Sequence, residues 1–372
     1  MSRMVRRGGC PARAGSLAGM TVQLEDTRPQ GRDLSPWRQA DARTRHRRRR
    51  MLLAVVIAFA LFVGFAGVPT GREWLTLWVL VTLFAAVGGD LAVWRRAVVK
   101  DWLPLLAVLF AYDLLRGLAN EIGGSLFGLD IWRSNPKNII SVSRAHLTEP
   151  LDADRWLFGG NVPTVWLQER FYDPGVAHWY DRIAVPVYLS HFVVSLGLLI
   201  VLWCVAYPVF RRFLASFLTL TLITLTTYVL YPAAPPWMAS LNGRLPDVDR
   251  VVQSTLHVLG GSTVNTAFEK GAAYSNPVAA MPSLHAAIPA LVLFFFWASA
   301  RWSVRVLLLA YALAMAVTLV YSGEHYVVDA LLGWLYAAVA VWVVNWVVRR
   351  NAAASAEERV GTAEVRERPA RR

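Results

Sequence analysis

The stretch Tyr321-Ser322-Gly323-Glu324-His325-Tyr326-Val327-Val328-Asp329 decides how the chain is interpreted, because its histidine and aspartate are four residues apart where an apolar run begins. In a helix, residues i and i+4 lie on one face within reach of each other. Asp329 is therefore expected to accept a hydrogen bond from one ring nitrogen of His325 and to leave the other nitrogen free as a nucleophile or base. A carboxylate inside a membrane span is costly, so this pair is a functional candidate.

A second histidine motif lies forty residues upstream, in Met281-Pro282-Ser283-Leu284-His285, and it also precedes an apolar run. Ser283 is expected to cap the helix that follows or to donate to a ligand oxygen, and Ser322 to cap the later helix in the same way. Helix N-termini are partly positive, so two that converge form an anion site. The anion we expect there is a phosphoryl group.

The composition is that of a membrane protein. Hydrophobic residues make up 56% of the chain and charged residues only 17%, far from the average soluble domain. The net charge of +13 does not indicate nucleic acid, because the arginines cluster at the ends of apolar runs, as topology determinants do. With only Cys10 and Cys204, neither a disulfide framework nor a cysteine-ligated metal site is indicated.

The apolar pattern predicts an all-α polytopic membrane protein with about eight transmembrane helices. The predicted spans are 51–69, 74–94, 102–118, 184–207, 213–231, 284–300, 304–321 and 326–348. Every second loop is basic, which predicts cytoplasmic termini in a multi-pass protein of the plasma membrane. The segments 119–183, 232–283 and 322–325 are then extracytoplasmic. His285 and His325 would both open spans from that side, at one depth.

The outer segments carry local signals of their own. Thr164–Tyr172 is predicted to form a short interfacial helix with Trp166, Leu167 and Phe171 toward lipid, and Val251–Leu259 a second short helix. The proline-rich stretch 232–237 predicts a stiff turn that ends a span, with Trp237 at the interface. Gly333 continues the face of Asp329 and would let another helix approach closely.

The motif PSLH followed by HYVVD resembles the second and third signature motifs of the type 2 phosphatidic acid phosphatase superfamily. The stretches YPAAPPW and SGEHYVVDALLG are similar to its inositol phosphorylceramide synthase-like branch. The resemblance covers roughly residues 100–348 and implies a six-helix core that works through a phosphohistidine. By this resemblance His325 attacks phosphorus and Asp329 orients it. His285 protonates the leaving oxygen and then activates the acceptor.

The chain also departs from the superfamily pattern. The Lys and Arg-Pro of the first motif, which clamp phosphate, have no match, and YPAAPPW occupies the comparable place without a cation. Thr318-Leu319 replaces the Ser-Arg of the third motif. Loss of the clamp is typical of the transferase-like branch. The resulting division is a disordered basic tail 1–50, two accessory transmembrane helices in 51–99, a catalytic membrane domain 100–348 and a disordered tail 349–372.

Other polar residues are candidates for binding the headgroup in place of the clamp. Asp113 and Arg116 could equally pair with each other, a loop lysine is commonly only solvated, and a histidine within a span can be purely structural. His191 is expected about two turns inside the membrane, facing the bundle. The candidate substrate-binding residues are Ser283, Ser322, Tyr112, Asp113, Arg116, Lys270, Tyr274 and His191.

The function predicted from these motifs is a lipid phosphotransferase or phosphatase at the extracytoplasmic face, with phosphoinositol or similar headgroup transfer favoured. It needs no metal or other cofactor, and its partners are membrane lipids, not nucleic acid. One alternative is a phosphatase that releases inorganic phosphate. Another is a metal hydrolase that uses His285, His325 and Asp329 as two-histidine, one-carboxylate ligands. A third is a non-enzymatic lipid transporter or scaffold, although no inverted repeat is evident.

Overall fold

The computed structural model describes residues 42–66, 72–108, 110–111, 125–126, 129–130, 133–134, 140–141, 145–259 and 278–367. Within these ranges the regular structure is helical apart from two antiparallel pairs of two-residue strands and two isolated β-bridges, and turns and loops connect these elements. Four helices are long and apolar enough to cross a membrane: Trp179–Val205, Tyr207–Leu230, Trp302–Tyr321 and Val327–Ser355. The molecule is thus an all-helical protein with several candidate membrane spans.

The remaining predicted spans correspond to shorter or partly described segments. Thr76–Ala86 and Leu284–Phe296 are apolar helices below span length. The first predicted span lies on a 25-residue helix, Ala42–Ala66, that begins with its arginine run. The third predicted span extends past the described residues. The four long helices therefore support a multi-pass protein, while the number eight stays a prediction.

The helices follow the chain in a simple order. The N-terminal part holds α1 (Ala42–Ala66), α2 (Arg72–Ala86), α3 (Leu91–Ala97) and the π-helical turn η2 (Val98–Trp102), followed by the strands β1 (Ser125–Leu126), β2 (Leu129–Asp130), β3 (Arg133–Ser134) and β4 (Ile140–Ser141). Next come α5 (Glu149–Leu157), α6 (Pro163–Phe171), α7 (Trp179–Val205), α8 (Tyr207–Leu230), α9 (Pro236–Leu241) and α10 (Val251–Leu259). The chain ends with α12 (Leu284–Phe296), α13 (Trp302–Tyr321) and α14 (Val327–Glu367).

The main core lies where α7, α8, α12 and α14 pack together. Its fully buried side chains are large and apolar, among them Leu199, Trp203, Phe213, Leu220 and Leu291. The outward faces of the same helices carry exposed residues of the same kind, such as Val193 and Leu335. Exposure of this kind is normal for a helix whose solvent is lipid.

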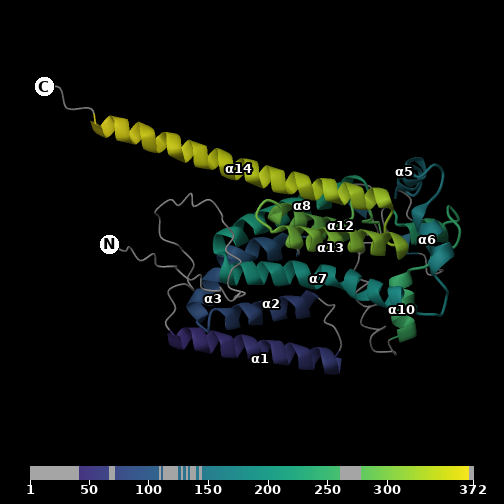
Figure 1. Ribbon diagram of the computed structural model, residues 1–372, viewed down its shortest axis with the longest axis horizontal. Helices are drawn as coiled ribbons and strands as arrows, with labels where there is room; N and C mark the ends of the chain where they lie inside the picture. The colour runs from purple at the N-terminus through teal and green to yellow at the C-terminus, as the bar shows by residue number, and fades with distance from the viewer. Residues whose placement is uncertain are drawn as a thin grey trace, which may run out of the picture.

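The short helices gather at one end of the bundle. Figure 1 shows α5, α6 and α10 at the right-hand end, while α3 lies at the left-hand end and α14 projects past it. All three come from the segments 119–183 and 232–283, which were predicted to share one side of the membrane. The two predicted short helices are confirmed, because α6 spans Pro163–Phe171 and α10 spans Val251–Leu259. We call α5, α6, α9, α10 and their connections the cap.

The proline-rich stretch 232–237 joins three distant segments through its backbone. Helix α8 ends at Leu230, and Ala233 forms parallel bridges with both His146 and Ala279. The Ala233 amide donates to the Val278 carbonyl at 2.9 Å, and the Ala280 amide donates to the Ala233 carbonyl at 3.2 Å. The stretch therefore ends the helix, as predicted, and also fixes the segment that leads into Ser283 and His285.

Candidate active site

The two histidine motifs are brought together by the packing of α12 against α14. Ser283 caps α12, as predicted, with its Oγ accepting from the Ala286 amide at 3.2 Å. The Ser283 amide in turn donates to the Asp329 carbonyl at 2.9 Å. A Cβ on Gly333 would collide with the Ser283 carbonyl oxygen and lie 3.4 Å from the Ala287 Cβ, which confirms the predicted close approach at this glycine.

Three histidine rings lie in series at this junction. The ring centroids of His285 and His325 are 6.0 Å apart, and those of His191 and His285 are 4.1 Å apart. Tyr188, one turn before His191 on α7, also stacks on His285, with ring centroids 5.0 Å apart. His191 is buried, so the prediction that it faces the bundle is confirmed. The rings of His285 and His325 are close enough to share one ligand.

Asp329 lies beside His325, but the local geometry differs from the predicted helical pair. His325 precedes α14, which begins at Val327, so the two residues do not share a helix face. The His325 Nδ1 atom and the Asp329 Oδ2 atom are 3.5 Å apart, longer than a typical hydrogen bond of this type. Asp329 Oδ2 accepts instead from the Tyr326 amide at 2.9 Å. The pair is thus adjacent, with room to tighten on a ligand.

Several polar atoms of this junction lack a hydrogen-bond partner within the described part of the chain. Four of them belong to the histidines and the aspartate and are buried: His191 Nδ1, His285 Nε2, His325 Nδ1 and Asp329 Oδ1. Buried polar atoms are nearly always paired, and exceptions concentrate at functional sites. Unused donors and acceptors around one point are what a polar ligand would satisfy.

The N-terminus of α14 is not an open anion site, contrary to the prediction. Asp154 of α5 is fully buried, and its two carboxylate oxygens accept from the Val327 amide at 3.0 Å and the Val328 amide at 2.9 Å. Burial raises the pKa of Asp154 to about 6, and the nearby Asp329 acts in the same direction. A carboxylate of the protein already occupies the place proposed for a phosphoryl group.

The predicted capping role of Ser322 is also wrong. Ser322 ends α13, and its Oγ donates to the Leu319 carbonyl at 3.2 Å. The reason is the turn at Gly323, which has a φ of +75° and separates the end of α13 from the start of α14. This conformation is readily available only to glycine. Ser322 is fully buried against its own helix, so its predicted contact with substrate receives no support from this geometry.

The cap is tied to the His325 loop by polar contacts that the sequence did not suggest. Gln168 of α6 donates from Nε2 to the carbonyls of Asp249 and Tyr321 at 2.9 and 2.8 Å, and its Oε1 accepts from the Asp249 amide at 2.9 Å. Arg250 pairs with Glu324 through two bonds of 2.8 and 3.2 Å. The Arg250 guanidinium also lies 4.8 Å from the ring of Trp237, which is half-buried under it.

The other sequence-predicted site residues cannot be placed, because Tyr112, Asp113, Arg116, Lys270 and Tyr274 lie outside the described residues. Within the described ranges no group of three His, Cys, Asp or Glu residues is arranged to hold a metal ion. Asp154, Gln168, Arg250 and Tyr188 were missed by the sequence analysis. Each acts across the fold on a partner far along the chain, and no local motif marks such a contact.

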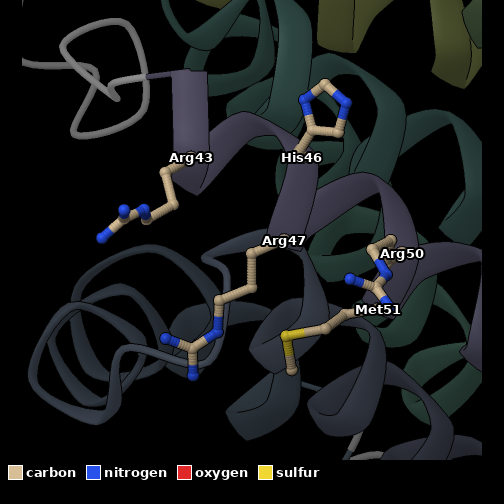
Figure 2. Close-up of a pocket in the computed structure, with 5 residues that line it drawn as sticks. All are labelled: Arg43, His46, Arg47, Arg50 and Met51. Atoms are coloured by element: carbon tan, nitrogen blue, oxygen red, sulfur yellow. The ribbon is translucent and has the colours of Figure 1, made fainter.

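A second polar feature lies away from His191, His285 and His325. A hollow of about 390 Å³ near the start of α1 is lined by Arg43, His46, Arg47, Arg50 and Met51, which are labelled in Figure 2. The arginines project from the helix in different directions (Figure 2). This part of α1 packs against the turn at Gly88 and Gly89, next to α3, so it lies at the opposite end from the cap.

Comparison with known proteins agrees with this geometry. A family model described as PAP2 superfamily matches residues 152–343, slightly more than half of the chain, including α12, α14 and both histidine motifs. The phosphoinositol dihydroceramide synthase of Bacteroides thetaiotaomicron is 31% identical over 140 residues, which is 34% of this chain and 45% of the synthase. The chain thus spans less than half the length of this relative. No solved structure matches. With its two histidine motifs and the extent of the family match, the chain belongs to the PAP2 superfamily, and the similarity to the synthase supports the inositol phosphorylceramide synthase-like branch.

Proposed function

We propose that this protein is a membrane lipid phosphotransferase that moves a phosphoinositol or similar headgroup through a phosphohistidine intermediate. The observation that carries the proposal is the 6.0 Å separation of the His285 and His325 rings, with the Asp329 carboxylate beside His325. Family membership supports phosphorus chemistry, and the similarity to a phosphoinositol dihydroceramide synthase supports transfer over release of inorganic phosphate.

The geometry supports a different role for each ring nitrogen of His325. Asp329 Oδ2 faces the Nδ1 atom of His325, so Nδ1 is expected to carry the proton and Nε2 to hold the nucleophilic lone pair. Nε2 attacks phosphorus, the bond from phosphorus to the leaving oxygen breaks, and His285 gives that oxygen a proton. His285 then takes the proton of the acceptor hydroxyl, whose oxygen attacks phosphorus and releases His325.

A neutral imidazole is a suitable nucleophile here. Phosphodiesters are anionic and repel anionic nucleophiles, while the imidazole of a phosphohistidine leaves readily in the second step. Ser283 and His191 are the substrate-binding candidates that the fold brings to the His285 side, and the unpartnered Nδ1 of His191 would donate to a phosphoryl oxygen. General acid–base help of this kind contributes about 10²–10⁴-fold in rate.

The proposed setting is a plasma-membrane protein of about eight spans with cytoplasmic termini and an extracytoplasmic site. Supporting it, the short helices from both predicted outer segments lie at the end where α12 and α14 begin, and the basic start of α1 lies at the other end (Figure 1). The catalytic domain would be 100–348, preceded by the tail 1–50 and two accessory helices in 51–99 and followed by the tail 349–372. The prediction that both tails are disordered is wrong for 42–50 and 349–367, because α1 begins at Ala42 and α14 continues to Glu367.

The test is incubation of the purified protein with phospholipids labelled in the headgroup, with and without ceramide-type acceptors. A labelled phosphoinositol product supports transfer, and free phosphate would mean a phosphatase. His325→Ala is expected to abolish turnover and acid-labile protein labelling, and vanadate to inhibit the wild type. The matched control is His257→Ala, at an exposed histidine of α10. A fully active His325→Ala protein would end the proposal.

A further inference from the structure

Asp154 is a fully buried carboxylate that the proposed mechanism does not use. It lies on α5, 173 residues before Val327, yet its two carboxylate oxygens accept hydrogen bonds from the first two amides of α14. Ionised carboxylates are costly to bury, and they persist where their hydrogen bonds or function require them. The position is therefore too specific to be explained by packing alone.

The amides that Asp154 accepts from lie between the two reacting side chains. His325 stands two residues before Val327, and Asp329 stands one residue after Val328. The Tyr326 amide, between His325 and Val327, is taken by Asp329 itself. Two carboxylates thus divide the three consecutive amides at the start of α14. Asp154 sets where the helix begins, and Asp329 is held in its first turn.

We propose that Asp154 is a positioning residue for the reaction centre: its carboxylate fixes the start of α14, and through it the distance between His325 and Asp329. The inference rests on the proposed function, because it assigns Asp154 a role in that reaction. It also assigns a role to the cap, since α5 holds the first turn of α14, directly after the loop that carries the nucleophile His325.

The protonation state of Asp154 determines how many amides it can hold. An ionised carboxylate accepts on both oxygens, whereas a protonated one presents a hydroxyl donor to one of the two amides and loses that bond. Burial raises the pKa of Asp154 from its usual 3.8 to about 6. The clamp is therefore complete above about pH 6 and weakens below it.

The same shift has the opposite sign for stability. The folded protein binds the proton more tightly than the unfolded chain, so this group's contribution to stability is complete below about pH 4 and is lost as pH rises through about 6. At neutral pH the ionised Asp154 carboxylate therefore holds both amides, but the protein is less stable than it would be with Asp154 protonated. Around Asp154 the titratable and charged groups in the described residues are Asp152 and Arg155 on α5, with Tyr326, Asp329 and His325 at the start of α14.

The experiment compares wild type with Asp154→Asn, which imitates the protonated acid at every pH. At pH 7.5 the variant is expected to lose about tenfold in kcat with KM within twofold, because geometry and not binding is altered. As pH falls to 5 the ratio of wild-type to variant kcat should approach one. A merely structural role would lower activity by the same factor at all pH values, and that result would overturn the proposal.

Two further variants keep the test sharp. Asp154→Ser keeps one acceptor oxygen without a titrating group, so its kcat ratio to Asp154→Asn should not change with pH. The control is Asp152→Asn on the same helix, whose carboxylate is mostly exposed and 3.4 Å from Arg155; it should match the wild type.

The thermal midpoint in detergent provides a readout independent of activity. Between pH 4 and 7 the wild-type midpoint should fall relative to that of Asp154→Asn, even if the proposed function fails. Parallel midpoints would show that Asp154 does not titrate in this range and would refute the clamp.

Discussion

Replacing Gly333 by alanine tests whether the α12–α14 contact sets the reaction geometry. The added Cβ would collide with the Ser283 carbonyl and touch Ala287. Alanine is favoured over glycine inside a helix by about 1 kcal/mol, while overpacking costs about 1–3 kcal/mol. The net loss of stability is therefore small, about 0–2 kcal/mol, and the protein should still fold.

The expected effect on activity is much larger. To relieve the collision the helices must separate by about 1 Å, which also stretches the 2.9 Å bond from the Ser283 amide to the Asp329 carbonyl. A misplacement of about 1 Å between reacting groups can cost about 10²-fold in rate. We expect kcat for headgroup transfer to fall by roughly that factor, while the thermal midpoint drops by only a few degrees.

The assay is headgroup transfer by purified variants in detergent, with thermal melts on the same samples. The matched control is Gly197→Ala, also inside a membrane helix but with nothing within 4 Å of its Cβ position. It should be neutral or slightly stabilising and fully active. If Gly333→Ala retained more than half of the wild-type kcat, the close approach of the two helices would not control the chemistry, and the reasoning would be refuted.

Three further predictions concern the loop that carries His325. Gly323→Ala should lower the thermal midpoint and activity together, because φ is +75° there and the new Cβ would lie 2.7 Å from the Asp249 carbonyl; a left-handed alanine alone costs about 1–2 kcal/mol. Gln168→Leu removes three hydrogen bonds and leaves buried backbone groups unpaired, at a cost of about 1–3 kcal/mol each. Denaturant melts should therefore show a loss of at least about 2 kcal/mol in the free energy of unfolding. Glu169→Gln, at the exposed neighbouring position, should show no loss. Arg250→Gln or Glu324→Gln alone leaves one charge of a mostly buried pair unpaired and should lower stability. The double variant should lose less stability than the sum of the two single variants, with a coupling of about 0.5–3 kcal/mol in a double-mutant cycle. Additive losses of stability would show that the pair contributes nothing.

The sequence predicted those features whose cause is local. The long apolar runs predicted the long helices, and the local patterns in the outer segments predicted the short helices α6 and α10. The proline-rich stretch 232–237 predicted the end of α8. Gly333 was recognised because a small residue on the face of Asp329 permits close helix packing. The approach of His285 to His325 followed from motif spacing and the alternation of basic loops.

The features that the sequence did not predict depend on contacts across the fold. The start of α14 was expected to include His325, but Asp154 and the Gly323 turn place it at Val327. Nothing near Asp154 in the sequence distinguishes it from Asp152, which is exposed on the same short helix. The error at Ser322 has the same origin, because the Gly323 turn leaves Ser322 at the end of α13 while Asp154 takes the capping place at the start of α14.

The length of α14 links the two ends of the molecule. Its 41 residues extend about 60 Å at 1.5 Å per residue, about twice the thickness of a hydrocarbon core. One continuous rod therefore runs from the first turn holding Asp329 to the far tip beyond α3 (Figure 1). A tilt of about 5° at the histidine end would swing that tip by about 5 Å over this length. A fluorophore attached to the tip would thus report, from the opposite end of the molecule, a tilt of α14 that accompanies turnover.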